Sequence, residues 1–550
     1  MIFNYFFSKD TLKNTLEYNE NFLNIENNFT KTINNANSLK TTDNIHLDFF
    51  MQLGRDLTDD DLNNYMTKCM YNDPYKTIAI IYNCRDRKNG KKEKEISNKA
   101  IKWLKNNNWN KTYEKNIYTY IDKYGCWKDI LYILLKSQEY NFEYKLIARQ
   151  LIIDKEELNN NNNISLCAKW VPSENNHYDK KLNCVKQIVD EIYKLDEKNL
   201  KKSYCDTKLK NKLKIYREHY LSPLRKKINI VESLMCKNKW GEIKYEKVPG
   251  IASKKLKNAF IKHDSDRYNK YLKNVITGKS KINVTGILPH ELVNYYLNSD
   301  NNDIELNDTI EAQWKTIVED IKKNGIFNKL IPIVDVSGSM FSANNGSIPA
   351  QVSIALGLLI SQCTEGIYKN KVITFSEIPE FHLIEGDTLK DQINSIKKMN
   401  WGYNTNFELV AKLIVDFGIM YGLNDYDMPN KLVILSDMQF DEATNNNNDN
   451  LELLYNTFGK IFINNNYKVP KLIYWNLNSN YSDTFPVNST IQGTSLISGF
   501  SEQLLKIFIE YDEFTPELIL NSILEKYIKN VIIDENELLT LSKSKLDKSL

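Results

Sequence analysis

The sequence predicts an α + α/β protein, in which an all-α module precedes a doubly wound α/β domain. Three observations predict this class. Apolar residues recur at helical spacing from about residue 46 to about residue 300. Short apolar strands alternate with helices from about residue 330 to about residue 510. An amphipathic helix over 309–323, which Asn324-Gly325 closes, joins the two regions.

A module of stacked helices is predicted for residues 46–308. Leu62, Met66 and Cys69 recur on one helical face there, and alternating strand patterns are scarce. Pro and Gly residues fall between the predicted helices. The pattern favours helix pairs in an α-solenoid of HEAT-like repeats or in a curved bundle. The preceding residues 1–45 are rich in Asn and weakly patterned, which is typical of a loosely ordered extension.

The α/β domain is predicted over residues 328–512, after a connecting segment at 309–327. Its expected strands are 330–335, 371–375, 381–385, 431–435, 471–475 and 494–497. Its expected helices are 349–364, 387–399, 406–420, 450–463 and 500–510. Near-continuous apolar strands are buried on both faces, so the sheet should be mostly parallel. Residues 513–550 should form a C-terminal helix near 516–527 and a polar tail, which either packs back or extends.

The net charge of +3 conceals an asymmetry between the two halves. Residues 1–300 hold 53 Lys and Arg against 37 Asp and Glu, whereas residues 301–550 hold 20 against 33. Residues 201–300 alone hold 23 against 9. A basic helical half suggests a polyanionic partner, most plausibly RNA. The alternative is an ordinary solvated surface in a protein whose composition is biased towards lysine.

Membrane insertion and secretion are not expected. No apolar run approaches the roughly 18 residues of a membrane span. The apolar start, residues 1–7, ends at Lys9 and Asp10, well short of a signal peptide. The eight cysteines contain no Cys-x-x-Cys pair, which indicates reduced, buried thiols in a cytoplasmic protein.

Oxygen-bearing side chains follow two of the predicted strands. Asp335, Ser337 and Ser339 come directly after the strand 330–335, and Asp437 follows the strand 431–435. Thr405 lies in a Gly-containing loop, where it could instead cap the next helix. Carboxylates and hydroxyls at strand ends suit a divalent cation, most plausibly Mg²⁺, with Mn²⁺ or Ca²⁺ as alternatives. The competing interpretation is an ordinary polar turn.

These five residues resemble the metal-ion-dependent adhesion site of a von Willebrand factor A domain. The resemblance implies that Asp335, Ser337, Ser339, Thr405 and Asp437 are the ligands, some of them through water. The helical half resembles a family of unknown function related to the TROVE domain of the Ro autoantigen, which joins helical repeats to a von Willebrand A domain. The motifs that carry this resemblance are residues 83–93, 124–130, 166–174, 216–225 and 245–249. By similarity it implies a Ro-like ring of helical repeats able to bind RNA.

Three functional readings follow. The first is a non-enzymatic RNA- or ribonucleoprotein-binding scaffold, with a metal-dependent docking site for a partner. Its candidate RNA contacts are Arg85, Arg87, Lys88, Lys91, Lys92, Arg225, Lys226 and Lys227. The second is a protein-interaction module without RNA, in which the metal accepts an acidic residue of a partner protein. The third and least favoured is a metal-dependent hydrolase or nuclease, since the sequence holds no His-Glu-x-x-His, Walker A or Gly-x-Ser-x-Gly motif.

Overall fold

The computed structural model describes two compact units that interleave along the sequence. The described residues are 28–135, 141–196, 209–298, 305–323, 325, 327–341, 349–375, 378–399, 406–441, 453–478, 484–510 and 512–540. The sheet unit takes its residues from Met1–Thr58, Leu288–Leu306 and Ile317–Ile523, and the helical unit from Asp59–Ile287, Asn307–Thr316 and Leu524–Leu550. This mixed helical and sheet content agrees with the predicted α + α/β class. The predicted domain boundaries stay predictions.

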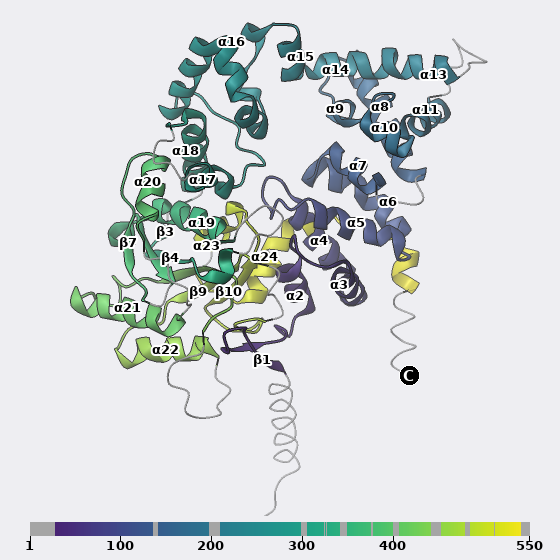
Figure 1. Ribbon diagram of the computed structural model, residues 1–550. Helices are drawn as coiled ribbons and strands as arrows, with labels where there is room; N and C mark the ends of the chain where they lie inside the picture. Colours follow the sequence, from purple (N-terminus) through teal and green to yellow (C-terminus); the bar gives the residue numbers. More distant parts are fainter. Residues whose placement is uncertain are drawn as a thin grey trace, which may run out of the picture. The chain divides into compact units, whose positions relative to one another are not determined.

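The sheet unit is built on a six-stranded sheet in the order β10-β9-β8-β4-β6-β7. Figure 1 labels four of its strands, β4, β7, β9 and β10. The strands are β4 (Leu330–Asp335), β6 (Lys371–Phe375), β7 (Phe381–Leu383), β8 (Lys431–Ser436), β9 (Lys471–Asn476) and β10 (Thr494–Ser498). All six predicted strands are confirmed, with ends that differ by two residues or fewer. Neighbouring strands are parallel, except that β7 runs antiparallel to β6 at one edge.

The strand order reverses beside β4. From β4 the chain first adds β6 and β7 on one side, and then adds β8, β9 and β10 on the other. Every residue of β4 and β8 is buried, as their apolar runs predict. The carboxyl ends of these two central strands therefore flank a topological switch point, where doubly wound sheets bind ligands.

Helix α19 (Pro349–Cys363) covers one face of the sheet centre. Its approach is close, because a Cβ atom built on Gly357 would lie 2.4 Å from Val334 Cγ2 and 3.7 Å from Leu435 Cδ1. Val334 and Leu435 are register partners on β4 and β8, so both side chains point to the same face. The absence of a side chain at Gly357 is thus what allows α19 to lie against both central strands.

Helices α21 (Phe407–Met420) and α22 (Leu454–Asn464) cover the opposite face. Phe407 contacts Phe375 on β6 and Tyr474 on β9, with ring centroids 6.1 Å and 6.2 Å apart. Phe375 pairs with Asp335, one position away from Val334, and alternate residues of a strand face opposite sides. The sheet is therefore covered by helices on both faces, as expected of a doubly wound arrangement.

Further elements complete the sheet unit. They are β1 (Phe29–Lys31), β2 (Asn37–Leu39), α2 (Ile45–Gln52), α17 (Pro289–Leu297), β3 (Phe327–Asn328), η5 (Gly338–Phe341), β5 (Thr364–Glu365), η6 (Gly366–Tyr368), α20 (Leu389–Ile396), η8 (Glu502–Lys506) and α23 (Ile507–Glu510). The short parallel pair of β3 and β5 has no counterpart in the predicted elements.

The N-terminal segment differs from the expected loose extension. Residues 1–27 lie outside the described residues, but 28–45 contain the antiparallel hairpin β1–β2. Leu39 of β2 exchanges two backbone hydrogen bonds with Phe485, at 2.8 Å and 2.7 Å. The pairing of β1 with β2 is local, but each strand has three residues of which only one is apolar, so no periodic pattern reveals the hairpin.

The helical unit contains only helices among its described regular elements. Along the chain they are α3 (Asp59–Asn72), α4 (Pro74–Arg85), α5 (Glu95–Asn106), α6 (Asn110–Thr119), η1 (Tyr120–Tyr124), α7 (Trp127–Leu135), α8 (Asn141–Asn159), α9 (Cys167–Trp170), α10 (His177–Leu182), α11 (Cys184–Leu195), α13 (Leu209–Ile215), η2 (Tyr216–Leu221), α14 (Ser222–Ile228), α15 (Val231–Cys236), η3 (Trp240–Glu242), η4 (Tyr245–Lys247) and α16 (Gly250–Ile276). The predicted connecting helix is α18 (Asp308–Lys322). The HEAT-like repeat arrangement stays a prediction.

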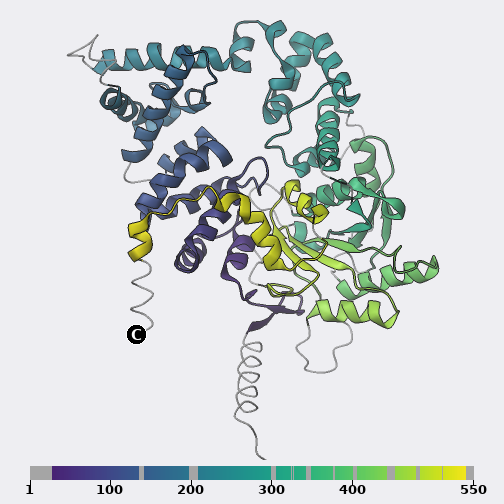
Figure 2. The ribbon, with the colours of Figure 1, turned by 180° about the vertical axis from the view of Figure 1, so that it is seen from behind.

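The end of the chain packs on the helical unit. The predicted C-terminal helix is α24 (Pro516–Ile528), and the segment after it runs beside α6 (Figure 2). Asn116 donates from Nδ2 to the carbonyl of Ile532 at 2.6 Å, and Glu537 accepts the backbone N–H groups of Lys111 and Thr112. The prediction for residues 513–550 is that they pack back on the α/β domain or extend; the described residues 524–540 instead belong to the helical unit.

A search of the described residues finds no helix that combines the length and the apolar character needed to cross a membrane.

We predict that Gly357→Ala destabilises the protein. The new methyl group would overlap Val334 Cγ2, and overpacking of this kind lowers the free energy of unfolding by about 1–3 kcal/mol. The matched control is Gly459→Ala in α22, where the nearest atom to the added Cβ is Val469 Cγ2 at 3.7 Å. The control should be neutral or stabilising by up to about 1 kcal/mol, because alanine favours helix. Denaturant unfolding of both variants measures the difference, and equal effects would contradict the prediction.

Candidate metal centre

Two buried aspartates lie at the switch point of the sheet. Asp335 is the last residue of β4, and Asp437 directly follows β8. Because β4 and β8 are adjacent parallel strands, their carboxyl ends meet at the same edge. Both side chains are fully buried, at 0% exposure. The two carboxyl groups therefore lie at the same edge of the sheet, and their role as metal ligands stays a prediction.

The Asp335 carboxylate is fixed from both strands. Its Oδ1 accepts the backbone N–H of Ser337 at 2.9 Å, and its Oδ2 accepts the hydroxyl of Ser436 at 2.5 Å. Its backbone N–H donates to Ser353 Oγ of α19 at 3.1 Å, and the Ser353 hydroxyl donates to the carbonyl of Leu435 at 2.9 Å. Ser353 thus joins the ends of β4 and β8 beneath the site.

The Asp437 carboxylate is held less completely. Its Oδ1 accepts the backbone N–H of Gln439 at 3.2 Å. Among the described residues its buried Oδ2 has no hydrogen-bond partner. Met438, which lies between Asp437 and Gln439, has a φ of 65°, a left-handed backbone conformation that is rare for residues other than glycine. A buried carboxylate oxygen without a partner is costly, so this atom indicates a place for a cation or another donor.

Two serine hydroxyls complete the described part of the site. Ser337 Oγ and Ser339 Oγ lie 3.2 Å apart on the loop that follows β4. Ser337 is buried, whereas Ser339 is half-buried and reaches the surface. Thr405, the fifth predicted ligand, lies outside the described residues. The structure therefore brings together four of the five predicted ligands.

Burial disfavours the charged forms of both carboxyls. Burial and the adjacent Asp437 carboxylate raise the pKa of Asp335 to about 7, against hydrogen bonds from Ser337 and Ser436 that act in the opposite direction. Burial likewise raises the pKa of Asp437, against hydrogen bonds from Ser339 and Gln439. Two like charges in this buried position repel each other. A divalent cation would offset this repulsion and would also give the unpartnered oxygen of Asp437 a ligand bond.

The donor set fits a hard cation. Two carboxylates and two hydroxyls are oxygen ligands of the kind that Mg²⁺ prefers. No group of three or more His, Cys, Asp and Glu side chains that could hold a metal occurs in the described parts of the chain, so a cation here would need the hydroxyls as well. Oxygen ligands alone disfavour zinc and other softer metals.

The N-terminal hairpin supports the second aspartate. Thr32 donates from Oγ1 to the carbonyl of Phe440 at 2.8 Å, and Asn34 donates from Nδ2 to the carbonyl of Gln439 at 2.9 Å. The backbone N–H of Ile33 donates to Gln439 Oε1 at 2.8 Å. These bonds fix the loop directly after Asp437, and so help to keep its carboxylate in place.

Sequence reasoning missed two supporting residues. Ser436 was visible beside Asp437, and its position at a strand end was the available signal. Ser353 gave no signal, because its role depends on how α19 crosses the sheet.

Three of the eight candidate RNA contacts have structural roles. Arg85 is buried, and its Nε and Nη2 lie 2.9 Å and 2.8 Å from Asp129 Oδ2. Arg225 donates to two carbonyls and to Ser173 Oγ at 2.7–2.8 Å, which fixes α14 against the 168–173 segment. Lys91 is 1% exposed, and burial lowers its pKa to about 8. Arg85 and Lys91 therefore do not face solvent as the RNA hypothesis requires, and the half-buried Arg225 already uses its guanidinium to hold three acceptors.

The other five candidates are nearer to the surface. Arg87 donates to the carbonyl of Gly125 at 3.4 Å, and Lys92 donates to the carbonyl of Ile287 at 3.2 Å. Lys88, Lys226 and Lys227 are exposed, and their ammonium groups form no ion pair with the described residues. A contact between any of these residues and RNA stays a prediction.

Comparisons with known proteins match most of the chain to families and a relative of unknown function. One family, described as a domain of unknown function (DUF2828), matches residues 32–145 and 136–327, and a second, also a domain of unknown function (DUF7788), matches residues 329–539. The uncharacterized protein L728 of Acanthamoeba polyphaga mimivirus is 32% identical over 541 residues, which are 93% of this chain and 90% of that protein. Among solved structures, the Ro (RSR) protein of Deinococcus radiodurans is similar over 88% of this chain and 100% of that chain, at 11% identity and a TM-score of 0.34.

We predict that the metal-free protein loses stability as the pH rises from about 4 to about 7. Across this window the folded protein keeps a proton on Asp335, whose ordinary pKa of 3.8 is raised to about 7, while the unfolded chain has released it. Asp335→Asn removes this titration, so its stability relative to the wild type should increase with pH. Denaturant unfolding in chelator across the window measures this difference. The exposed Asp416→Asn serves as a control, and parallel curves for wild type and Asp335→Asn would contradict the prediction.

Proposed function

We propose that this chain, which belongs to the DUF2828 family of unknown function, is a non-enzymatic scaffold with two binding functions. The sheet unit docks a partner through a divalent cation, and the helical unit binds RNA. The observation that carries the proposal is the pair of buried carboxylates at the switch point, with Asp437 Oδ2 unpartnered among the described residues. Both proposed functions are binding functions, so neither requires a side chain that acts as a general acid or base.

The architecture around the carboxylates supports a von Willebrand A type of domain. A mostly parallel six-stranded sheet ends in an antiparallel edge strand, and the site lies where the strand order reverses. On this proposal the ion is Mg²⁺, and its ligands are Asp335, Ser337, Ser339, Thr405 and Asp437. The unpartnered Asp437 Oδ2 offers the ion a ligand on the buried side of the site, and the half-buried Ser339 leaves the opposite side open to solvent and a partner.

The ion would supply a positive charge and a coordination position for an acidic group of a partner. Because two carboxylates carry two negative charges, the cation leaves the local site neutral and so able to accept another carboxylate. Both carboxylates would be committed as ligands, so neither is left as a general base for hydrolysis. The set of oxygen ligands therefore supports a docking function better than it supports the hydrolase alternative.

The charge of the helical unit supports the RNA function. Residues 201–300, of which 209–298 are described, hold 23 Lys and Arg against 9 Asp and Glu. Lys88, Lys226 and Lys227 present exposed ammonium groups that can neutralise backbone phosphates. The alternative is a protein-interaction module that uses the metal site without RNA. It predicts that the basic surface has no affinity for RNA even at low salt.

We predict that Mg²⁺ stabilises the folded chain and that Asp335→Ala abolishes this effect. At about 100 times its Kd, an ion that binds only the folded state raises the free energy of unfolding by about 2.7 kcal/mol. Denaturant unfolding with and without Mg²⁺ measures the gain, and Mn²⁺ and Ca²⁺ are titrated in parallel. Asp416→Ala, an exposed aspartate of α21, should respond like the wild type. A wild-type protein that shows no gain from any of the three ions would refute the metal site.

We predict that the full chain binds single-stranded RNA with an affinity that falls steeply as salt increases. Lys226→Ala/Lys227→Ala should make the negative slope of log K against log salt shallower by about 1.4, because each phosphate contact on a single strand contributes about −0.7 to that slope. The control is Lys369→Ala/Lys398→Ala, which removes two exposed lysines of the sheet unit. Fluorescence anisotropy across a salt series measures both. Failure of the wild type to bind RNA at low salt would leave the protein-interaction alternative.

A further inference from the structure

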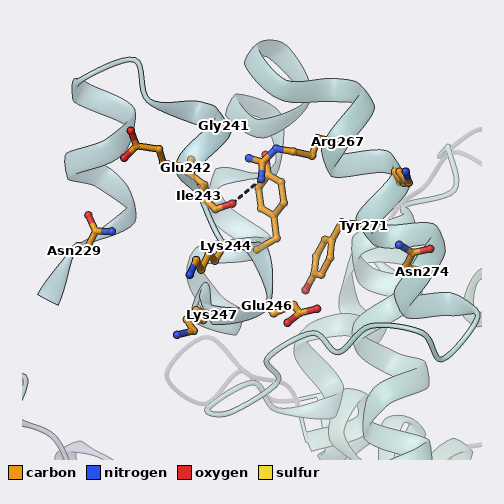
Figure 3. Close-up of a pocket in the computed structure, with 12 residues that line it drawn as sticks. Asn229, Gly241, Glu242, Ile243, Lys244, Glu246, Lys247, Arg267, Tyr271 and Asn274 are labelled. Carbon is orange, nitrogen blue, oxygen red and sulfur yellow. Dashed lines mark hydrogen bonds between the residues drawn. The ribbon is translucent and has the colours of Figure 1, made fainter. Parts of the chain in front are cut away.

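A surface pocket of about 700 Å³ lies in the helical unit, and none of the residues that line it is among the candidate RNA contacts considered so far (Figure 3). Its lining comes from three segments: Asn229, which follows α14, the stretch 241–247, and α16. The volume falls within the range of about 300–1,000 Å³ that is usual for small-molecule sites. The pocket can therefore admit a group the size of a nucleotide.

One face of α16 supplies a wall of this pocket. Arg267, Lys270, Tyr271 and Asn274 follow one another at intervals of three, one and three residues, which places them on the same side of a helix. Figure 3 shows Arg267, Tyr271 and Asn274 along α16, while Lys244 and Lys247 extend from the other wall. The helical spacing thus gathers two cations, an aromatic ring and an amide on one surface.

Arg267 is held rigidly at the pocket wall. Its Nη1 donates to the carbonyl of Ile243 at 2.7 Å and its Nη2 to the carbonyl of Trp240 at 2.5 Å. Its Nε donates to Asp264 at 2.8 Å, at the point where α16 is kinked. The guanidinium also lies 4.6 Å from the centre of the Tyr245 ring. Arg267 therefore fixes the 240–245 segment, and its side chain is still 39% exposed.

The wall of the pocket includes two well-packed tyrosine rings, which together are called the tyrosine wall. Tyr245 and Tyr271 stack with ring centroids 5.5 Å apart, and both belong to a buried apolar cluster that includes Phe260 and Tyr268. Their hydroxyls donate to Asp264 and to the carbonyl of Lys281. Because these rings are fixed, a ligand would meet a preformed surface and lose little conformational freedom on binding.

The charge of the pocket is positive and is not neutralised by its own residues. Lys244, Lys247 and Lys270 are exposed, and within the described part of the chain none of them forms an ion pair or donates a side-chain hydrogen bond. Of the two lining carboxylates, Glu242 pairs with Lys239 at 2.6 Å, whereas Glu246 accepts the hydroxyl of Ser280 at 2.6 Å and keeps its negative charge. The lining still holds four cationic side chains against these two carboxylates. Three uncommitted ammonium groups thus surround a cavity with aromatic and amide walls.

We propose that this pocket binds single-stranded RNA, with a phosphodiester group held by Lys244, Lys247 and Lys270 and the attached nucleoside against the tyrosine wall. The proposal rests on the RNA function proposed above, and it names the site. The surrounding excess of basic residues favours a long polyanion, whose neighbouring phosphates can reach the surface lysines outside the pocket. A single strand fits better than a duplex, because only an unpaired nucleotide can enter a cavity.

The test compares two triple variants of the full chain. Lys244→Ala/Lys247→Ala/Lys270→Ala removes the pocket ammonium groups, while Lys237→Ala/Lys262→Ala/Lys279→Ala removes three exposed lysines that do not line it. Anisotropy of a labelled oligouridine is measured across a salt series, beside a blunt RNA duplex. The pocket variant should lower the slope of log K against log salt for oligouridine by about 2 more than the control does, and should bind the duplex as the control does. Thermal unfolding checks that both variants fold.

Other outcomes overturn the inference. If the wild type binds oligouridine and the two triple variants behave alike, the pocket is not the site, although the RNA function stands. If the wild type binds no RNA at low salt, the RNA function itself fails. If the pocket variant loses binding of adenosine monophosphate or of poly-glutamate but keeps that of oligouridine, the pocket serves a small anion or an acidic chain instead.

Discussion

The repulsion between two buried carboxylates is the constraint on which the sheet unit depends. Asp335 and Asp437 end adjacent parallel strands, and neither side chain reaches solvent. Burying one charge without compensation is costly, and burying two of the same sign is costlier. A fold that kept this arrangement only for stability would gain by replacing either aspartate with an apolar residue. The arrangement therefore supports the proposed ligand site, in which a bound cation would offset this cost.

Residues from distant parts of the chain hold the two carboxylates in place, and together they make the site rigid. Ser353 reaches Asp335 and Leu435 from α19, and the close contact at Gly357 brings that helix within reach of both strands. The N-terminal hairpin fixes the loop beyond Asp437 through Thr32 and Asn34. Rigid placement limits how far the carboxylates can separate, so their repulsion is relieved by a proton on Asp335 or, on the proposed function, by a bound cation.

Much of this fold could be predicted from the sequence, because local patterns determine it. All six strands of the large sheet follow from apolar runs, and Asp335 and Asp437 follow from their positions directly after two of those runs. The strands of the hairpin β1–β2 are too short and polar to show a periodicity. Its bonds to the loop after Asp437, like the role of Ser353, depend on contacts between distant segments. The same limit applies to charge. A sequence shows that Arg85 and Arg225 are basic, but only the fold shows that each is used to hold backbone or carboxylate partners.

That distinction changes how the basic composition of the helical unit should be interpreted. Arginines such as Arg85, Arg225 and Arg267 serve as multivalent donors that fix loops, since a guanidinium can bond several acceptors at once. Lysines such as Lys244, Lys247 and Lys270 keep their ammonium groups in solvent. The charge available to a polyanion is therefore carried mainly by lysine, and a lysine surface recognises phosphate by charge rather than by fixed geometry. An RNA partner held in this way would be selected for accessible backbone, and any sequence preference would have to arise at the fixed aromatic wall beside Arg267.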